Sequence, residues 1–267
     1  MRENSLKRKL AAGQVAIGTT LAFPCPELVE ACGLLGFDFV FIDGEHDGAS
    51  PRDCQELVRA ADAVGVHAVV RVPRNDPQTI LGYLETGALS IVAPHVNTAE
   101  EARAGIRAVR YPPEGIRGAG SATRAANYGI TQTGAEHFAF ANSQTLFMPL
   151  LEEARAFDNL DEILQVEGLE AIQIGPGDLA LSMGYPGQAN HPAVQEKVQA
   201  GLEKAKRAGI YVGTATRDAA TTRACIERGF NTILASSGTI FIEGVRQFMR
   251  ESGLPGSGAA AGTGAVR

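Results

Sequence analysis

The chain contains no tryptophan, few aromatic residues and only four cysteines. Those cysteines, Cys25, Cys32, Cys54 and Cys225, show neither C-x-x-C pairing nor a histidine at zinc-ligand spacing, which favours free thiols over disulfides or a metal cluster. No stretch approaches the roughly 20 apolar residues of a membrane-spanning helix. The segment MRENSLKRKLAAGQVAIGTT at the start also lacks the apolar core of a signal peptide. We therefore expect a soluble cytoplasmic protein.

Positive charge is also scarce. The chain has 24 lysines and arginines against 30 acidic residues, a formal net charge of −6, and its basic residues are scattered. A nucleic-acid-binding surface needs basic side chains clustered along the phosphate backbone, so nucleic acid is not an expected partner. What the chain does have is 267 residues with 45% hydrophobic content, which is enough for a sizeable core.

Short apolar, β-branched runs alternate with segments of helical period, which is the pattern of βα units around a parallel sheet. Eight strands are expected near Val15–Thr19, Phe37–Asp43, Ala68–Val72, Leu89–Ala93, Leu146–Leu151, Ala171–Ile174, Ile210–Gly213 and Thr232–Ala235. This count predicts an α/β fold, a single-domain (β/α)8 TIM barrel over residues 1–254. The Gly/Ala-rich residues 255–267 are expected to form a disordered tail.

Local signals mark several helices between these strands. Ser50 followed by Pro51 predicts a capped helix start, and Thr98 with Glu101 predicts a capping box. Residues 158–168, DNLDEILQVEG, read as an amphipathic helix closed by glycine. Residues 110–129 form the longest irregular stretch, which is too long for a passive connection and therefore indicates a functional loop.

Active sites of (β/α)8 barrels lie at the carboxyl ends of the strands. Ionisable residues gather at five of these expected strand ends: Asp43, Glu45, His46, Arg71, His95, Glu152, Glu153 and Asp178. Glu152 and Asp178 are one βα unit apart, so they should lie on adjacent strands about 5 Å apart. Two carboxylates so placed can share a divalent cation such as Mg²⁺, Mn²⁺ or Co²⁺, which leaves other positions open to water and substrate.

Each of these residues also has a structural explanation. A lone histidine such as His46 is more often structural than catalytic, Arg71 can simply pair with Glu45, and Asp178 is a suitable N-cap for the helix after it. The remaining histidines are read as structural: His67, His95, His137 and His191. Because complementary groups at separate strand ends are hard to obtain from core packing alone, the combination favours an active site.

Several segments together resemble the HpcH/HpaI aldolase family: FDFVFIDGEH, VVRVP, RYPPEGIRGAGSA, FDNLDEILQVEGLEAIQIGPGDLALSMGYPG and HPAVQE. The resemblance covers about residues 10–244. It implies a barrel that assembles into homo-oligomers, namely hexamers. It also implies a class II, metal-dependent aldolase that acts on pyruvate or hydroxypyruvate and an aldehyde, of the 4-hydroxy-2-oxoheptanedioate or 2-keto-3-deoxy-sugar-acid type.

The resemblance assigns a role to each group of strand-end residues. It makes Glu152 and Asp178 the metal ligands, Arg71 the keto-acid ligand, and His46, held by Asp43, the acid–base pair. It further implies substrate binding by Ser121 in the long loop and by main-chain groups at Gly175, Pro176 and Gly177.

These roles agree with the chemistry of the side chains. A divalent ion can polarise the keto acid and stabilise its enolate. Arg71 can bind a carboxylate bidentately, which lysine cannot, and a histidine such as His46 is a common group for moving protons. The expected strands five to seven contain no lysine, which argues against a Schiff-base aldolase.

Two segments depart from the family pattern. Leu150 stands where the family usually has a glutamine, two residues before the metal-binding glutamate, and residues 234–242 also differ from the usual family sequence. Both departures bear on substrate choice. Two alternatives therefore stay open: a lyase similar to citramalyl-CoA or malyl-CoA lyase, which would need a basic nucleotide site, and a catalytically weakened, metal-dependent keto-acid binding protein.

Overall fold

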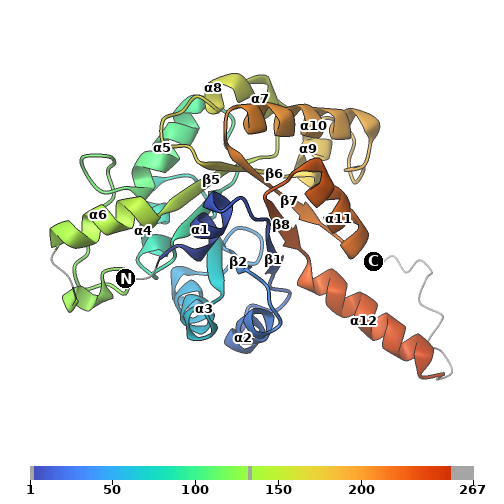
Figure 1. Cartoon of the computed structure of the whole chain (residues 1–267), viewed down its shortest axis with the longest axis horizontal. Helices are drawn as coiled ribbons and strands as arrows, with labels where there is room; N and C mark the ends of the chain where they lie inside the picture. Colours follow the sequence, from blue (N-terminus) through green and yellow to red (C-terminus); the bar gives the residue numbers. More distant parts are fainter. Residues whose placement is uncertain (1–2, 132–133, 254–267) are drawn as a thin grey trace, which may run out of the picture.

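The computed structural model of the chain describes residues 3–131 and 134–253 (Figure 1). The expected tail over residues 255–267, and residue 254 at the expected domain boundary, lie outside this part. In the described part, a ring of strands is surrounded by helices, as the alternating sequence pattern predicts.

Eight parallel strands form a closed barrel in chain order, and β8 pairs with β1 to close it. The strands are β1 (Ala16–Thr20), β2 (Phe39–Asp43), β3 (His67–Arg71), β4 (Ser90–Ala93), β5 (Leu146–Leu151), β6 (Ala171–Ile174), β7 (Tyr211–Thr216) and β8 (Thr232–Ala235). The bounds of β5, β6 and β8 coincide with the prediction, and the other strands differ from it by one to three residues. The predicted (β/α)8 barrel is confirmed.

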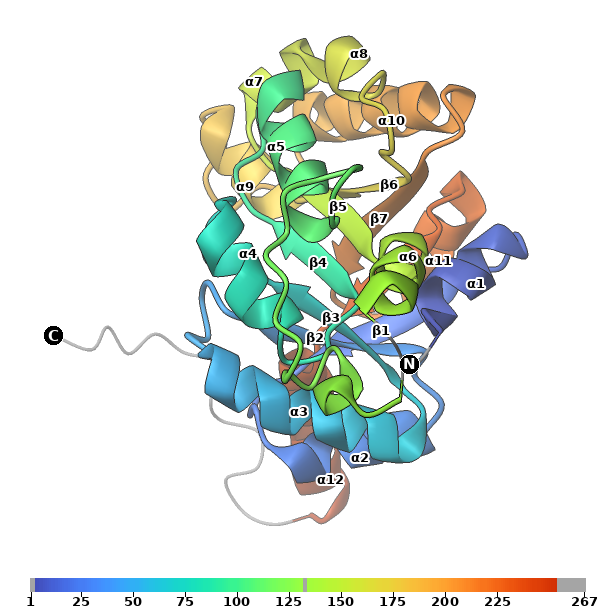
Figure 2. The same ribbon diagram turned by 90° about the vertical axis from the view of Figure 1, so that its left-hand side faces the viewer.

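Helices connect the strands, and most of them cover the outside of the barrel (Figure 2). They are α1 (Ser5–Ala11), α2 (Pro26–Leu34), α3 (Pro51–Val64), α4 (Pro77–Leu84), α5 (Ala99–Val109), η1 (Asn127–Gly129), α6 (Gly134–Gln144), α7 (Ala154–Asp158), α8 (Leu160–Ile163), α9 (Pro176–Ser182), α10 (Pro192–Arg207), α11 (Ala219–Arg228) and α12 (Ser237–Glu251). None of these helices of the described chain is both long and apolar enough to cross a membrane.

The capping signals in the sequence are confirmed, but one helix is shorter than predicted. Ser50 caps α3, and Thr98 forms a capping box at the start of α5. The helix expected over residues 158–168 is confirmed only over α8, which ends at Ile163, and the chain then forms turns. Those turns bury Val166 and Leu169, so core packing overrides the amphipathic period there.

The core has two layers, as expected for a barrel covered by helices. One cluster fills the barrel interior and includes Phe39, Phe41, Val69, Met148 and Leu150. The other cluster lies between the strands and the surrounding helices. The four cysteines all lie in the described part and are free thiols, as predicted, with Cys32 and Cys54 fully buried.

Helix α12 leaves the barrel instead of covering it, and Figure 1 shows it extending away at the carboxyl-terminal end of the described chain. All its residues are exposed or half-buried, although it carries large apolar side chains. Phe241 packs edge-on against Phe23, with ring centroids 6.0 Å apart, and Phe248 is 68% exposed. An apolar face of this size is unusual on an isolated soluble chain.

Candidate active site

The carboxyl ends of β2 and β3 are joined by a buried ion pair. Asp43 and Arg71 are register partners in these adjacent strands. Arg71 donates from Nε to Asp43 Oδ1 at 3.0 Å and from Nη2 to Asp43 Oδ2, and its Nη1 lies 3.1 Å from Glu45 Oε2. Burial by itself would raise the pKa of Asp43, but the hydrogen bonds and charge of Arg71 outweigh it and hold that pKa below its usual value. The alternative pairing of Arg71 with Glu45 is therefore present, together with a stronger pairing with Asp43.

The tight turn after β2 explains the run of Asp, Gly, Glu and His in the sequence. Asp43 Oδ1 accepts the main-chain N–H groups of Glu45 at 2.9 Å and His46 at 3.2 Å. Gly44 is required because a Cβ there would lie 2.7 Å from Tyr83 Oη and 2.8 Å from the carbonyl oxygen of Arg71. The turn therefore presents Glu45 and His46 at the rim of the barrel.

The same turn corrects the expected role of Asp43. Its carboxylate is turned to Arg71 and to main-chain N–H groups, so it does not orient the imidazole of His46. The His46 side chain is 66% exposed, and its Nε2 lies 3.9 Å from Glu45 Oε2. Glu45 is thus the carboxylate beside His46, because the Asp43 oxygens are already used by stronger partners.

Glu152 follows β5 and is the most buried acid of the site, with a side chain 3% exposed. The register of β5 and β6 places it beside Gly175, where a Cβ would lie 3.0 Å from the Cβ of Glu152. Asp178 lies in the first turn of α9 just beyond. The pKa of Glu152 is raised by burial and by the charges of Asp178 and Glu45, although the N–H of His95 opposes this. Negative charge is therefore concentrated at this point of the rim.

Glu152 and Asp178 fit a divalent cation by their donor chemistry. Carboxylate oxygens are the donors that Mg²⁺ and Mn²⁺ prefer, and a cation would offset the crowded negative charge. No group of three or more His, Cys, Asp or Glu residues that could hold a metal occurs in residues 3–131 and 134–253. Metal binding by these two carboxylates, with the other positions left to water and substrate, stays a prediction.

Residues 175–178 are arranged differently from the expectation. Gly175 is the N-cap of α9 and has no side chain to cap it, so the predicted N-cap role of Asp178 is wrong. The N–H of Gly175 donates to Leu151 O at 3.1 Å, and Pro176 has no N–H. The main-chain donors that remain for a substrate are those of Gly177 and Asp178, in the first helical turn.

His95, read from the sequence as structural, lies in the site. It follows β4 and has a left-handed backbone, with φ 55°. Its N–H donates to Glu152 Oε1 at 3.0 Å. Its Nδ1 lies 3.0 Å from Glu153 Oε1, and its Nε2 lies 3.5 Å from Glu45 Oε1. The only sequence signal was its position at the carboxyl end of a strand, which it shares with Arg71 and Glu152.

The long loop over residues 110–129 runs along the outside of the barrel, past α5 and α4 (Figure 2). It follows the carboxyl end of α5 and contacts the end of α4: a Cβ on Gly118 would lie 3.3 Å from Leu81, and Arg117 pairs with Glu85 at 3.2 Å. Ser121, in this loop, is therefore not brought to the site within the chain. Because α5 carries the chain away from the carboxyl ends of the strands, the approach of Ser121 to a substrate stays a prediction.

The other predicted positions have clear surroundings. Leu150 lies in the barrel interior beneath Glu152 and is in register with Gln173, whose Nε2 donates to Thr232 Oγ1 at 3.2 Å. His191 is the N-cap of α10, and His137 lies 3.3 Å from Tyr111 Oη. The structural reading of these two histidines is confirmed.

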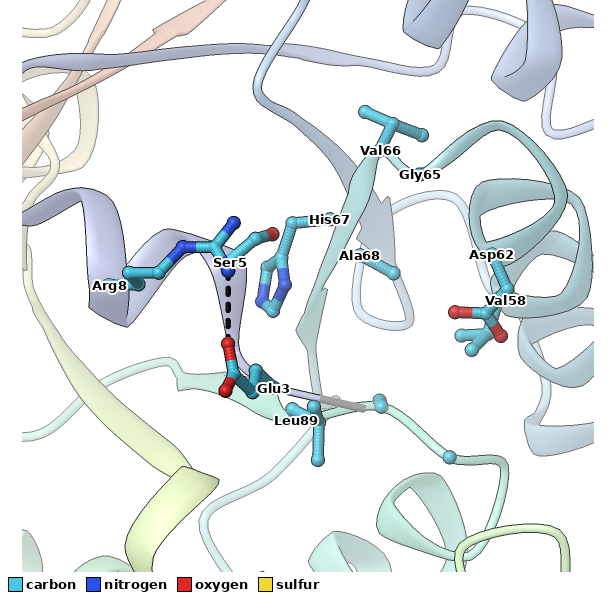
Figure 3. Close-up of a pocket in the computed structure, with 12 residues that line it drawn as sticks. Glu3, Ser5, Arg8, Val58, Asp62, Gly65, Val66, His67, Ala68 and Leu89 are labelled. Atoms are coloured by element: carbon cyan, nitrogen blue, oxygen red, sulfur yellow. Dashed lines mark hydrogen bonds and ion pairs between the residues drawn. The ribbon is translucent and has the colours of Figure 1, made fainter. Parts of the chain in front are cut away.

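A hollow of about 330 Å³ lies at the amino ends of the strands (Figure 3). His67, at the start of β3, is buried in its wall and lies 2.8 Å from Ser90 Oγ, and Glu3 pairs with Arg8 at 3.0 Å across the opening. Burial lowers the pKa of His67 to about 4, which keeps the ring neutral. His67 is structural, as predicted, and this hollow is separate from the carboxyl-end site.

Comparison with known proteins gives consistent matches. A model of the family HpcH/HpaI aldolase/citrate lyase matches residues 21–243. A hydroxypyruvate/pyruvate aldolase from Sagittula stellata is 37% identical over 227 residues, covering 85% of this chain and 88% of the relative. A 4-hydroxy-2-oxovalerate aldolase from Rhodococcus jostii is 40% identical over 217 residues, covering 80% and 81%.

Comparison of the fold with a solved structure agrees with these sequence matches. The crystal structure of an HpcH/HpaI aldolase/citrate lyase family protein from Burkholderia cenocepacia superposes with a TM-score of 0.89 at 31% identity, covering 93% of this chain and 99% of that one. The family model spans most of the chain, and the matched segment contains every residue of the rim from Asp43 to Asp178. The chain therefore belongs to the HpcH/HpaI aldolase/citrate lyase family.

Proposed function

We propose that this protein is a class II aldolase, a carbon–carbon lyase that makes or cleaves the bond between the enolate of pyruvate or hydroxypyruvate and an aldehyde. The observation that carries the proposal is the order of groups along one rim: Arg71 at the end of β3, Glu152 after β5 and Asp178 after β6. A cationic fork and a carboxylate pair on neighbouring strands suit a keto acid whose carboxylate and ketone must be held together.

Some residues of the site would bind the metal and the keto acid, and others would transfer a proton. When bound by Glu152 and Asp178, a divalent cation such as Mg²⁺, Mn²⁺ or Co²⁺ would supply electron withdrawal from the ketone. Arg71 would orient the keto-acid carboxylate, since Asp43 holds its guanidinium in a fixed plane. Exposed His46 would carry a proton to and from the aldol hydroxyl, and Glu45 beside it would stabilise the charged ring.

The metal requirement can be tested directly. Chelation with EDTA should abolish aldol cleavage, and Mn²⁺ or Co²⁺ should restore it, because the site lacks a lysine for Schiff-base chemistry. Glu152→Gln should lose Mn²⁺ binding, measured by calorimetry without substrate, and so separate the metal site from turnover. Full activity in the stripped enzyme, or borohydride trapping of a pyruvate adduct, would refute a metal-dependent mechanism.

A keto-acid binding protein with weakened catalysis is the second candidate. Leu150 supports it, since this apolar side chain lies directly beneath Glu152, where a polar group is usual in the family. Turnover with a panel of aldehydes, compared with binding of pyruvate alone, distinguishes the two functions. Binding without turnover of any aldehyde would favour the second candidate.

We also propose that the protein acts as a homo-oligomer in the cytoplasm, with the hexamer implied by the family resemblance. The exposed apolar side chains of α12, including Ile240, Phe241 and Phe248, support association, because such a face is stabilised by burial against another chain. Light scattering coupled to size-exclusion chromatography measures the subunit number. A monomer at micromolar concentration would refute the oligomer.

A further inference from the structure

In the proposed function Glu45 serves only to stabilise the charged ring of His46, yet it lies at the centre of the site. Its side chain is 14% exposed and is surrounded by three nitrogen groups: Arg71 Nη1 at 3.1 Å, His95 Nε2 at 3.5 Å and His46 Nε2 at 3.9 Å. Its Oε2 is buried and has no hydrogen-bond partner, so the close contact with Arg71 is an ion pair without hydrogen-bond geometry. Glu45 is therefore shared among several partners and fully satisfied by none of them.

The position of Glu45 matters for the keto acid. Asp43 accepts hydrogen bonds from Nε and Nη2 of Arg71. The nitrogen of the guanidinium that remains for a substrate carboxylate is therefore Nη1. Glu45 already faces that edge. Two carboxylates at one Nη1 repel each other, so Glu45 and the keto acid compete for the same group.

His95 offers Glu45 an alternative partner. Its left-handed backbone is held by Asn97, which donates to the His95 carbonyl at 3.2 Å, and by Asn159, which donates to the Asn97 carbonyl at 2.8 Å. Glycine would adopt this backbone without strain, so the hydrogen bond to Glu152 does not by itself account for an imidazole here. The ring is 62% exposed, so burial in the core does not account for it either. Its place is defined by the carboxylates that it contacts.

We propose that Glu45 and His95 are positioning residues that set the affinity of Arg71 for the keto acid. Glu45 neutralises Arg71 in the free protein, and His95 holds Glu45 when the keto-acid carboxylate takes Nη1. The inference rests on the proposed function, because it assumes that Arg71 binds the keto acid. No covalent bond changes: one carboxylate exchanges partners.

The test is a double-mutant cycle on pyruvate affinity, measured by calorimetry with saturating Mn²⁺. Glu45→Gln keeps the shape and removes the competing charge, so it should tighten pyruvate binding on the order of tenfold. His95→Gly keeps the backbone and removes the imidazole, so it should weaken binding by a similar factor. In the double variant the effect of His95→Gly should vanish, because no charged Glu45 remains to be held.

Two further variants control for folding and strain. Tyr128 is another residue with a left-handed backbone, with φ 58°, in the loop far from the site. Tyr128→Gly relieves the backbone strain at this position and should leave pyruvate affinity unchanged. Asparagine also tolerates the left-handed backbone, so His95→Asn replaces His95→Gly in the double-mutant cycle if the glycine variant is unstable. Steady-state kinetics of the His95 variants should show a change in KM for the keto acid with a smaller change in kcat, since positioning acts on binding.

The outcomes separate the inference from the proposed function. Weaker binding in Glu45→Gln, or an effect of His95→Gly that persists in the double variant, would overturn the inference while wild-type binding upholds the function. Failure of the wild type to bind pyruvate with Mn²⁺ would overturn both.

Discussion

Replacement of Arg71 by lysine separates the binding role of this residue from its structural role. The guanidinium contacts Asp43 through two nitrogens and Glu45 through the third, and its side chain is only 12% exposed. A lysine ammonium keeps the charge but lacks the planar fork of the guanidinium. It can therefore bind only one of the surrounding carboxylates with good geometry. The fold should survive, because the buried carboxylates still face a cation.

The magnitude follows from the hydrogen bonds that the keto acid would lose. A hydrogen bond to a charged group contributes about 1.5–3 kcal/mol, so pyruvate affinity should fall about 10- to 150-fold. Calorimetry with Mn²⁺ measures this loss, and a parallel titration with Mn²⁺ alone should show an intact metal site. Thermal unfolding without ligand reports the separate structural cost.

Arg117→Lys is the matched control. Arg117 is also buried, pairs with Glu85 at 3.2 Å and stacks over Tyr111 at 4.5 Å, but it lies at the opposite end of the barrel. Its replacement should lower the melting temperature and leave pyruvate affinity unchanged. If Arg71→Lys behaves in the same way as this control, the guanidinium is structural and the proposed keto-acid subsite is wrong.

Further variants test the proton-transfer residue and the pH dependence of stability. His46→Ala should lower kcat by about 10²- to 10⁴-fold with little change in Mn²⁺ affinity, and a near-normal cleavage rate would show that the histidine is structural. If pyruvate methyl-proton exchange survives in this variant while cleavage fails, His46 serves only the aldol hydroxyl. Burial lowers the pKa of His67 from 6.5 to about 4, so the unfolded chain binds the proton first as pH falls. Stability should therefore decline between about pH 6.5 and pH 4 by up to about 3 kcal/mol, and urea unfolding of His67→Gln should show a smaller decline.

The barrel could be predicted from the sequence because its signals are local. Apolar, β-branched runs such as FVFID specify buried strands, and Ser50 and Thr98 mark helix starts through contacts only three residues away. Parallel strands in chain order then bring all carboxyl ends to one rim, so Glu152 and Asp178 had to be neighbours. The proximity of these two carboxylates therefore followed from strand order, without knowledge of any side-chain contact.

Contacts between distant residues could not be predicted in this way. The sequence placed Asp43 near His46, but the register of β2 and β3 turns Asp43 to Arg71, which offers a stronger partner. Ser121 lies in a loop that looked functional, yet α5 carries the chain away from the carboxyl ends of the strands. His95 carried no motif, and only the left-handed turn after β4 brings it among the carboxylates.

The sequence by itself thus determined the elements, their order and the rim on which the ionisable groups gather, because hydrophobic period, capping and chain order are short-range properties. Only the tertiary structure decided which group pairs with which: Arg71 with Asp43 and Glu45, and Glu152 with the N–H of His95. The physical reason is that a charged side chain has several rotatable bonds and can reach many partners. Leaving a buried charged or polar group unpaired costs free energy, so the fold adopts the pairing that leaves the fewest such groups without a partner.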